Sequence, residues 1–173
     1  MNPEEIKKLL GLSPLPGEGG WFRETWRSGL AAGPLDPSAN STPSKVRFAD
    51  QPHQAGTAIY YFLGPQDKSR LHRIPGDEIY HHYAGGPVNL LLLGTGGAKL
   101  VQLGTQWELG QRPQILVPGG TWQGSWVAGE PGWALLGTTV VPGFEFSEWE
   151  AGDRTELATQ FSQFAKEIAH LCE

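Results

Sequence analysis

Strand-length apolar runs closed by glycine or proline dominate residues 57–150 and most constrain the fold. Thr57–Leu63 is followed by Gly-Pro, and Val88–Leu93 is followed by Gly-Thr-Gly-Gly. Glycine adopts turn conformations that other residues avoid and proline presets them, so the 24 glycines and 14 prolines suit short strands joined by tight turns. About ten such strands, without the alternation of strand and helix that a parallel sheet needs, predict an antiparallel sandwich or barrel.

Helices are expected only at the two ends of this all-β chain. Residues 3–10 predict a short helix that Asn2 caps and Gly11 ends. Residues 154–171 predict a longer helix, which Asp153 opens and which carries one apolar stripe. That stripe consists of Leu157, Phe161, Phe164, Ile168 and Leu171. Both helices are expected to pack on the outside of the strands.

Residues 28–56 break the strand pattern with a stretch rich in Gly, Pro, Ser, Ala and Asn, which predicts a long surface loop. A loop of this length is either a lid over a site or a tolerated insertion, and both interpretations stay open. Residues 144–149 alternate apolar and polar side chains again, as a short strand does. No repeat and no second boundary divides residues 1–173, so a single domain is expected.

The charge and cysteine content argue against several classes of protein. A net charge of −5 without a basic stripe argues against a nucleic-acid surface and against a polybasic membrane patch. No apolar run approaches the length of a membrane span, and the N-terminus lacks the apolar segment of a signal peptide. Cys172 is the single cysteine and cannot form an internal disulfide, which fits a reducing compartment. A cytoplasmic protein with no nucleic-acid or membrane partner is expected.

Residues 69–85 gather most of the candidate chemistry, with three of the five histidines beside a carboxylate. The stretch predicts two strands joined as a hairpin at a Pro-Gly-Asp turn. Side chains alternate between the two faces of a strand, so Glu78, Tyr80 and His82 are expected on one face. His72, on the preceding strand, is expected to converge with Glu78 on one cavity.

The spacing of these residues resembles the two sequence motifs of a cupin. The first motif runs His-x-His, three or four residues, Glu, six residues and Gly. His72, Glu78 and Gly85 match that spacing, and Ile74 stands in place of the second histidine. In the second motif, Pro-x-Gly is followed after two residues by a histidine, and Gln123 stands at that position. The chain thus has the spacing of a cupin with only part of its metal-binding residues.

A closer resemblance extends over nearly the whole chain, from residue 12 to about residue 151. Its matching segments are residues 14–25, 57–60, 69 with 72–73, 77–81, 117–118 with 122–123, and 141–146. In these segments the chain resembles the cupin family called domain of unknown function 985, also termed cupin type five. The resemblance implies a double-stranded β-helix, the cupin jelly-roll barrel, with its core over residues 57–150. It also implies a homodimer, and it implies no established reaction.

A cupin metal centre needs three imidazoles and a carboxylate around one ion. Only His72, Glu78 and Gln123 stand at the corresponding positions, and an amide oxygen is a weak ligand for a transition metal ion. An inward-facing His82 would restore a second imidazole. This set does not favour a tightly bound native metal, so no cofactor is expected. If a metal does bind, His72, Glu78 and Gln123 are its expected ligands.

An imidazole beside a carboxylate is suited instead to proton transfer near neutral pH. His72 and Glu78 are therefore the candidate catalytic residues. Seven further residues are candidates for binding the ligand, two of them tyrosines that could donate a proton and two of them arginines that could hold an anion. These candidate ligand-binding residues are Arg23, Tyr60, Arg73, Tyr80, His82, Trp122 and Gln123.

Three hypotheses follow for the function. The leading one is a cupin that binds a sugar-like or carboxylate molecule in its barrel and acts as a metal-independent epimerase or isomerase. The second is a non-catalytic sensor or binding module with the same pocket, and the third is a metal-dependent dioxygenase or isomerase. The expected protein partner is a second copy of the chain, joined through an edge strand and its aromatic face.

Overall fold

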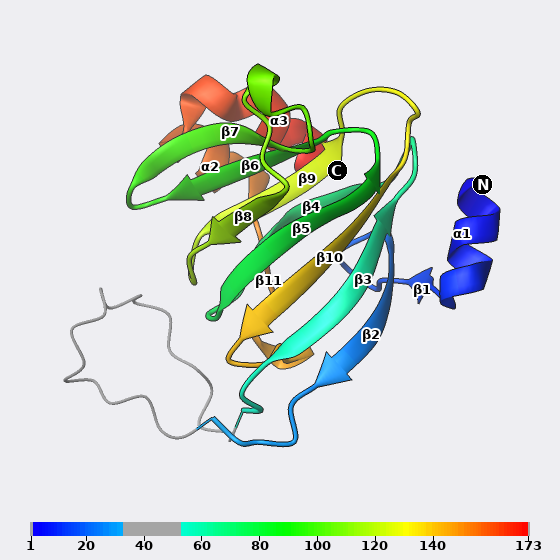
Figure 1. The fold of residues 1–173 in the computed structure, drawn as a ribbon. Coiled ribbons are helices and arrows are strands. Elements are labelled where there is room, and N and C mark those ends of the chain that lie inside the picture. Colours follow the sequence, from blue (N-terminus) through cyan, green and yellow to red (C-terminus); the bar gives the residue numbers. More distant parts are fainter. Residues whose placement is uncertain (1, 33–52, 173) are drawn as a thin grey trace.

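The computed structural model describes residues 2–32 and 53–172, whose strands form two sheets packed face to face (Figure 1). The strands of the first sheet are β1 (Ser13–Pro14), β2 (Trp21–Arg27), β3 (Thr57–Leu63), β5 (Asp77–Gly85), β8 (Gln114–Val117) and β10 (Ala134–Val141). The strands of the second sheet are β4 (Lys68–Arg73), β6 (Val88–Gly94), β7 (Gly97–Leu103), β9 (Trp122–Val127) and β11 (Glu150–Ala151).

Strand order within each sheet is that of a jelly roll. The first sheet runs β1-β2-β3-β10-β5-β8 and the second runs β11-β4-β9-β6-β7. Neighbouring strands are antiparallel throughout, and β6 and β7 form a local hairpin. The arrangement confirms the all-β fold that the turn spacing predicted and the jelly roll that the family resemblance implied.

Strands β4 and β5 follow each other in sequence but do not pair, so the predicted hairpin over residues 69–85 is wrong. β4 pairs with β9 and β11 in the second sheet, whereas β5 pairs with β10 and β8 in the first. The turn at residues 74–76 therefore crosses from one sheet to the other. As a result, His72 and Glu78 lie on facing layers of the sandwich rather than side by side on one layer.

The inner faces of the two sheets form the main core. Along β6, Leu90 and Leu92 pack into this core, while Leu91 and Leu93 face the other way and pack under the C-terminal helices. A strand buried on both faces has no polar side to expose. This double burial explains why residues 88–93 are an almost unbroken apolar run.

The N-terminal helix α1 (Pro3–Leu10) has the expected bounds. The Asn2 side chain accepts a hydrogen bond from the backbone N–H of Glu5, and the Glu5 side chain accepts one from the N–H of Asn2. At the other end, Gly11 adopts a positive φ of 62° and ends the helix. Local sequence signals are therefore sufficient to define this element.

The predicted C-terminal helix over residues 154–171 is broken in the middle. It consists of α2 (Arg154–Gln160), the 3-10 turn η3 (Ser162–Phe164) and α3 (Ala165–Leu171). Phe161, with φ −125° and ψ 56°, lies outside the helical region. Side chains of both helices pack into one cluster against the second sheet, and Phe161, at the break, belongs to the same cluster. The cluster residues from this part of the chain are Leu157, Phe161, Ile168 and Leu171.

The predicted surface loop over residues 28–56 lies mostly outside the described residues. Its two described ends form a short stem, in which Ala31 and Gln54 form an antiparallel bridge. The N–H of Ala32 donates to the carbonyl oxygen of His53 at 2.7 Å. In the part of the chain that the structure describes, no helix has the length and apolar character needed to cross a membrane.

Candidate functional site

A cavity of about 70 Å³ lies between the two sheets at one end of the sandwich. Its walls come from the inner faces of β2, β3, β5 and β10 on one side and from β4 on the other, and most of them are apolar. The charged or ionisable groups that line it, tyrosine apart, are Glu18, Glu24, Arg27, His72 and Glu78. Both candidate catalytic residues therefore reach one enclosed space.

His72 faces the interior from β4, where it is paired with Gln123 of β9, and it is 2% exposed. Its Nδ1 lies 2.7 Å from the carbonyl oxygen of Arg70. Because a carbonyl oxygen only accepts, Nδ1 carries a proton and donates it, and the neutral ring keeps its lone pair on Nε2. The Trp149 ring stacks on the imidazole with centroids 5.7 Å apart and so fixes the plane of the ring. His72 is thus held as a base whose free nitrogen is Nε2.

Glu78 lies at the start of β5, in the facing sheet, and is 7% exposed. Gln123 Nε2 donates a hydrogen bond of 2.6 Å to Glu78 Oε2 from β9. Burial raises the pKa of Glu78 above its usual value, and the charge of Glu18 raises it further. When the His72 ring is protonated, its charge lowers this pKa in part, and so do hydrogen bonds from Thr138 and Gln123. Because the shift is upward, Glu78 keeps its proton to a higher pH than an ordinary glutamate.

Glu18 brings a second carboxylate to the same end of the cavity from the turn between β1 and β2. Its Oε1 accepts a hydrogen bond of 2.7 Å from Ser69 Oγ, and its Oε2 lies 3.8 Å from His72 Nε2. That second distance is too long for a direct hydrogen bond. Tyr61 of β3 lines the same space, and its hydroxyl donates to the carbonyl oxygen of Gly19 at 2.9 Å. Burial raises the pKa of Tyr61 well above its usual value, so the phenol stays protonated.

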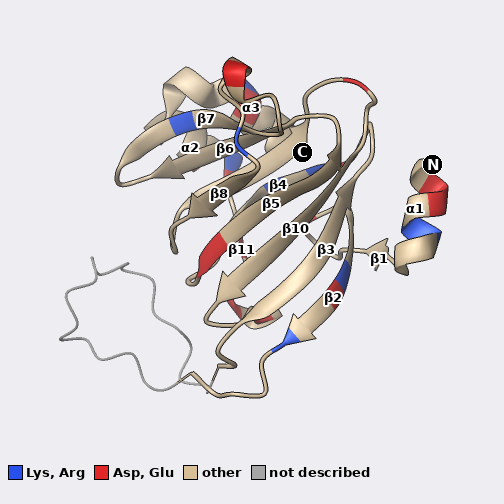
Figure 2. Cartoon of the chain, in the orientation of Figure 1, with Lys and Arg blue, Asp and Glu red and all other residues tan. Residues whose placement is uncertain are grey.

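A β-bulge in β2 determines which of its charges face the cavity. The register with β3 shifts after Glu24, so that Glu24 opposes Ile59 and Arg27 opposes Thr57. Glu24 and Arg27 consequently both line the cavity, and their Oε2 and Nη2 atoms lie 2.9 Å apart. Plain alternation would place Arg27 on the same face as Arg23. Figure 2 shows acidic and basic positions close together along β2.

Residues 142–149, which we call the covering segment, lead from β10 to β11 and close the cavity with Phe144 and Phe146. The strand predicted for residues 144–149 is wrong, because the segment contains the 3-10 turn η2 (Phe146–Glu148). Two ion pairs and one histidine–carboxylate hydrogen bond hold the segment and the residue that follows it. The ion pairs are Arg27–Glu145 at 2.8 Å and Arg73–Glu150 at 2.7 Å, and the hydrogen bond joins His53 and Glu148 at 2.9 Å.

Four of the predicted ligand-binding residues lie outside the cavity, which corrects their assignment to a ligand in the barrel. Arg23 opposes Tyr60, which opposes Gly137, in a row on the outer face of the first sheet. Arg73 and Trp122 lie on the outer face of the second sheet, with the guanidinium 4.4 Å from the indole centroid. Each of the four is next in sequence to a residue that faces the interior, so strand alternation carries it to the opposite face.

The other three predicted ligand-binding residues point inward, with different access to the cavity. Tyr80 and His82 share the inner face of β5 with Glu78, because they oppose buried residues of β10. Tyr80 is 1% exposed and belongs to the core, and His82 lies farther along the strand, with Nε2 2.9 Å from the Gly86 carbonyl oxygen. Gln123 is fully buried, and its Oε1 has no hydrogen-bond partner among the described residues. Whether any of the three touches a ligand stays a prediction.

The comparison of sequences identifies the family. Residues 4–152 match the model of the cupin superfamily domain DUF985, Cupin_5. The chain belongs to this family. The match includes every residue that lines the cavity and stops before the C-terminal helices. The cavity is therefore a feature of the cupin domain itself.

Three proteins of similar sequence or structure match this cupin over most of its length. The uncharacterized protein YML079W of Saccharomyces cerevisiae is 28% identical over 138 residues, which are 76% of this chain and 66% of the yeast protein. The crystal structure of protein SO0799 from Shewanella oneidensis matches with a TM-score of 0.80 and 29% identity over 100% of this chain and 98% of that one. A hypothetical protein from Leishmania major matches with a TM-score of 0.83 and 27% identity over 99% and 98%. None of these names states a reaction.

Oxalate decarboxylase from Bacillus subtilis, whose Mn(II) centres are the subject of one structure, shares the fold alone. One of its structures matches with a TM-score of 0.53 and 13% identity over 92% of this cupin and 37% of that chain. The donor set of this cupin does not fit such a centre. Within residues 2–32 and 53–172, no three His, Cys, Asp or Glu side chains lie close enough together to hold one ion. We therefore derive no step through a metal.

The cavity residues that sequence reasoning missed include Glu18, Arg27 and Tyr61. Glu18 lies in a glycine-rich turn, where no periodicity tells which way a side chain points. Tyr61 lies in a strand that is apolar on both faces, so alternation could not favour it over Tyr60. The bulge that redirects Arg27 has no marker in the sequence. The one usable signal for Glu18 was its place inside the family-matching segment 14–25.

Proposed function

We propose that this cupin binds a small molecule between its sheets and moves protons on it by metal-independent acid–base chemistry, as an epimerase or isomerase. One observation carries the proposal: two buried groups with opposite tasks face the same cavity from different sheets. His72 offers the lone pair of Nε2, and Glu78 offers a carboxyl whose pKa is raised. The cytoplasmic location expected from the sequence stays a prediction.

Inversion at a carbon next to a carbonyl needs a base on one side of that carbon and a proton donor on the other. His72 Nε2 takes the proton as the C–H bond breaks, and the electron pair moves onto the carbonyl oxygen of an enolate. The protonated Glu78 carboxyl then gives its proton to the opposite face of the carbon, which forms the new C–H bond. Gln123 Nε2 donates to the Glu78 carboxylate that results. Return of a proton from the imidazolium to Glu78 through solvent restores both groups.

Of the two ligand classes expected from the sequence, a sugar-like molecule suits the cavity better than a carboxylate. The two arginines that were expected to hold an anion lie outside it. Arg27 does line the cavity, but Glu24 and Glu145 already pair with it. At the buried end the cavity presents the Glu18 carboxylate, which repels a ligand anion at short range.

Exchange of a ligand hydrogen with solvent tests the acid–base proposal. In D2O, the wild-type protein is expected to exchange one C–H next to the carbonyl of an aldohexose, ketohexose or amino sugar, as read by NMR. His72→Asn and Glu78→Gln are each expected to lower the exchange rate about 10²- to 10⁴-fold, because each removes a proton-transfer group. His81→Asn is the matched control, because His81 faces the outer side of β5, opposite Gly137.

Two other results would replace the proposal. Tight sugar binding without exchange of any hydrogen would indicate the non-catalytic binding module. Stoichiometric metal in protein purified without an affinity tag, together with loss of exchange when that metal is removed, would indicate the metal-dependent enzyme. Exchange that survives in both His72→Asn and Glu78→Gln would show that these two groups do not move the protons.

A further inference from the structure

We infer that residues 145–147 of the covering segment are a gate, which moves away from the sheets to let a ligand enter the cavity. The inference rests on the proposed function for the size of the ligand. The cavity of about 70 Å³ is far smaller than the roughly 300–1,000 Å³ of pockets that hold drug-sized molecules. A sugar-like ligand therefore needs more room than the closed structure offers. The inference goes further because it names the wall that moves.

The walls of the cavity consist of strands and of three connections between strands. Opening a strand wall would break the hydrogen bonds of a sheet, so the connections are the candidates for an entrance. Two of them are tied to neighbouring chain by their backbones. In the turn between β1 and β2, the Glu18 carbonyl oxygen accepts from the N–H of Arg70 at 2.9 Å. In the crossing at residues 74–76, the Ile74 carbonyl oxygen accepts from the N–H of Gly120 at 2.8 Å.

The covering segment is the third connection, and it is fixed near its two ends. The N–H of Gly143 donates to the Gln54 carbonyl oxygen at 2.8 Å, and the buried side chains of Glu148 and His53 form a hydrogen bond of 2.9 Å. Between these points, in the part of the chain that the structure describes, the backbone of residues 145–147 forms no hydrogen bond with either sheet. These three residues can therefore move outward while both sheets stay intact.

Side chains keep this middle part closed. Phe146 lines the cavity and is also 56% exposed, so its ring separates the cavity from solvent. Arg27 Nη1 donates to Glu145 Oε1 at 2.8 Å, and the two side chains are 35% and 44% exposed. An ion pair that is exposed to this degree is weak and is screened by salt. The Arg27–Glu145 pair is therefore a latch that opens at low cost.

A gate at this place serves the proposed reaction in three steps. Open, it admits a ligand that is larger than the closed cavity. Closed over the ligand, it keeps bulk water from competing with Glu78 as the proton donor to the enolate. Reopening then gives the solvent access through which a proton returns from His72 to Glu78.

Labelling of a thiol inside the cavity measures the opening without any ligand. In a Cys172→Ala background, Val140→Cys places one thiol on the cavity wall, and uncharged 4,4′-dithiodipyridine reports its reaction by absorbance. Glu145→Gln is expected to raise the labelling rate about two- to fivefold, because it weakens the latch without changing a side chain that lines the cavity. Added NaCl is expected to raise the rate when Glu145 is present but hardly when it is Gln, because salt screens the same pair. Thermal unfolding establishes that each variant is folded, and Thr138→Cys supplies a second thiol on the same wall.

Two controls separate the gate from a general loosening of the fold. Glu150→Gln removes another exposed ion pair, with Arg73, but β11 stays paired with β4 through its backbone, so labelling in the cavity is expected to stay unchanged. Val88→Cys places a thiol in the core away from the cavity, and Glu145→Gln is expected to leave its labelling rate unchanged. Equal acceleration by the two Glu→Gln changes, equal acceleration at the two thiols, or no acceleration in the cavity would each overturn the inference.

Two further outcomes separate this inference from the proposed function. Labelling that depends on the latch, without deuterium exchange on any of the sugars, would keep the gate and remove the acid–base enzyme. Deuterium exchange on a sugar, with cavity labelling that Glu145→Gln leaves unchanged, would keep the enzyme and remove the gate.

Discussion

The position of Glu78 in the sequence leads to its burial, and its burial determines its chemistry. The crossing at residues 74–76 brings it into the first sheet opposite His72, and Gln123 Nε2 donates a hydrogen bond of 2.6 Å to its carboxyl group. Burial raises the pKa of its carboxyl because an ionised oxygen loses the solvation of water. The same shift that would let Glu78 act as a proton donor also makes the fold sensitive to pH.

Replacing Glu78 by Gln is expected to change how stability depends on pH. The folded protein binds the Glu78 proton more tightly than the unfolded chain, in which this carboxyl titrates near 4.5. This contribution to the free energy of unfolding is thus fully present below that pH and is lost as the pH rises through the raised pKa of the folded state. Glu78→Gln cannot ionise and still accepts from Gln123, so it is expected to lack this loss and to be more stable than wild type at neutral pH.

Urea denaturation at a series of pH values between about 4 and 8 measures the difference. Glu24→Gln is the control, because it removes a carboxyl at the mouth of the same cavity, where Arg27 is the partner. The control is expected to keep the loss of stability with rising pH that wild type shows. Parallel pH profiles for wild type and Glu78→Gln would contradict the burial of an ionisable carboxyl at this position.

At the scale of the elements, the covering segment is held by charge more than by regular structure. It contains one 3-10 turn, and Arg27 reaches it twice, through Glu145 Oε1 at 2.8 Å and the Phe144 carbonyl oxygen at 3.1 Å. Those contacts exist only because the bulge in β2 turns Arg27 toward the cavity. A local irregularity in one strand therefore positions a segment that lies more than a hundred residues away in the sequence.

Arg27→Gln is expected to loosen the covering segment. Hydrogen exchange of the backbone amides in residues 142–149 is expected to become faster, because the segment loses an ion pair and a hydrogen bond to its backbone. The cost in the free energy of unfolding is expected to stay below about 1 kcal/mol, since the pair is partly exposed. Arg23→Gln, on the outer face of the same strand, should leave this exchange unchanged. Equal effects of the two substitutions would show that Arg27 does not hold the segment.

The turns and the apolar runs were sufficient to predict most of the elements but not their partners. Strand β3 has the bounds that the apolar run over residues 57–63 predicted, because Gly64 and Pro65 close that run. Pairing depends on contacts between distant parts of the chain, and so the crossing at residues 74–76 could not be told from a hairpin turn. His72 and Glu78 were expected to share a cavity because they were placed on one hairpin. They line one cavity even though that hairpin is absent, because they face each other from the inner sides of two sheets.

The same limit explains which site residues could not be predicted. Arg23, Tyr60, Arg73 and Trp122 were chosen for the chemistry of their side chains and not for the strand face on which they lie. Side chains alternate between the two faces of a strand, and all four lie on the outer faces of the sheets. Strand register, β-bulges and turns therefore determine which site residues face the cavity, and composition and motif spacing do not reveal them.

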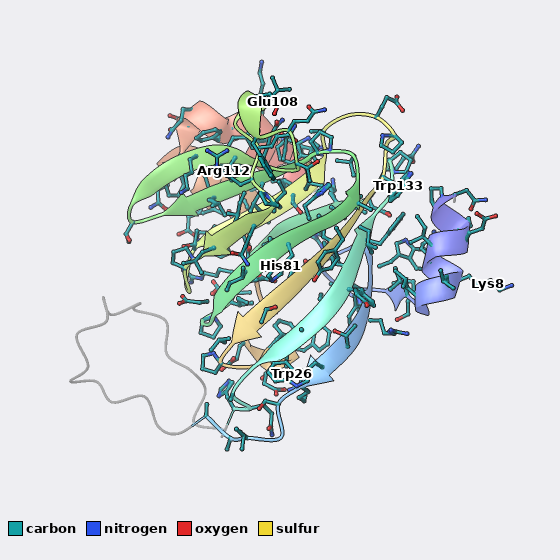
Figure 3. All side chains as sticks on the ribbon, viewed as in Figure 1. Lys8, Trp26, His81, Glu108, Arg112 and Trp133 are labelled. Atoms are coloured by element: carbon teal, nitrogen blue, oxygen red, sulfur yellow. The ribbon has the colours of Figure 1, made fainter. Side chains whose placement is uncertain are left out.

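At the scale of the whole molecule, the two sheets differ in how their outer faces are covered. Helices α2 and α3 pack on the second sheet, whereas no described helix packs on the outer face of β5 and β8 in the first (Figure 1). Side chains on that face include Trp26, Tyr83 and Leu116, which are 50%, 52% and 53% exposed. Figure 3 labels two residues of this sheet face, Trp26 on β2 and His81 on β5.

The homodimer expected from the sequence is accordingly predicted to form through this outer face, with β8 as its edge strand. Light scattering coupled to size exclusion is expected to give the mass of a dimer for the wild type. Leu116→Glu is expected to shift the equilibrium toward the monomer, because it places a charge in an apolar interface. Trp107→Glu, on η1 (Trp107–Leu109), is the control, because Trp107 is 67% exposed at a different place. A wild-type monomer would contradict the prediction.

The crossing between the sheets has a consequence for how such a pocket can change. Only five residues separate His72 from Glu78 along the chain, yet the two side chains belong to different layers. Gly119 packs so closely on the Pro75 carbonyl that any larger side chain there would push the crossing aside. The gap between the two side chains is thus governed by one short connection. Insertion or deletion of a single residue there would give evolution, or an engineer, a way to widen or narrow the pocket without altering either chemical group.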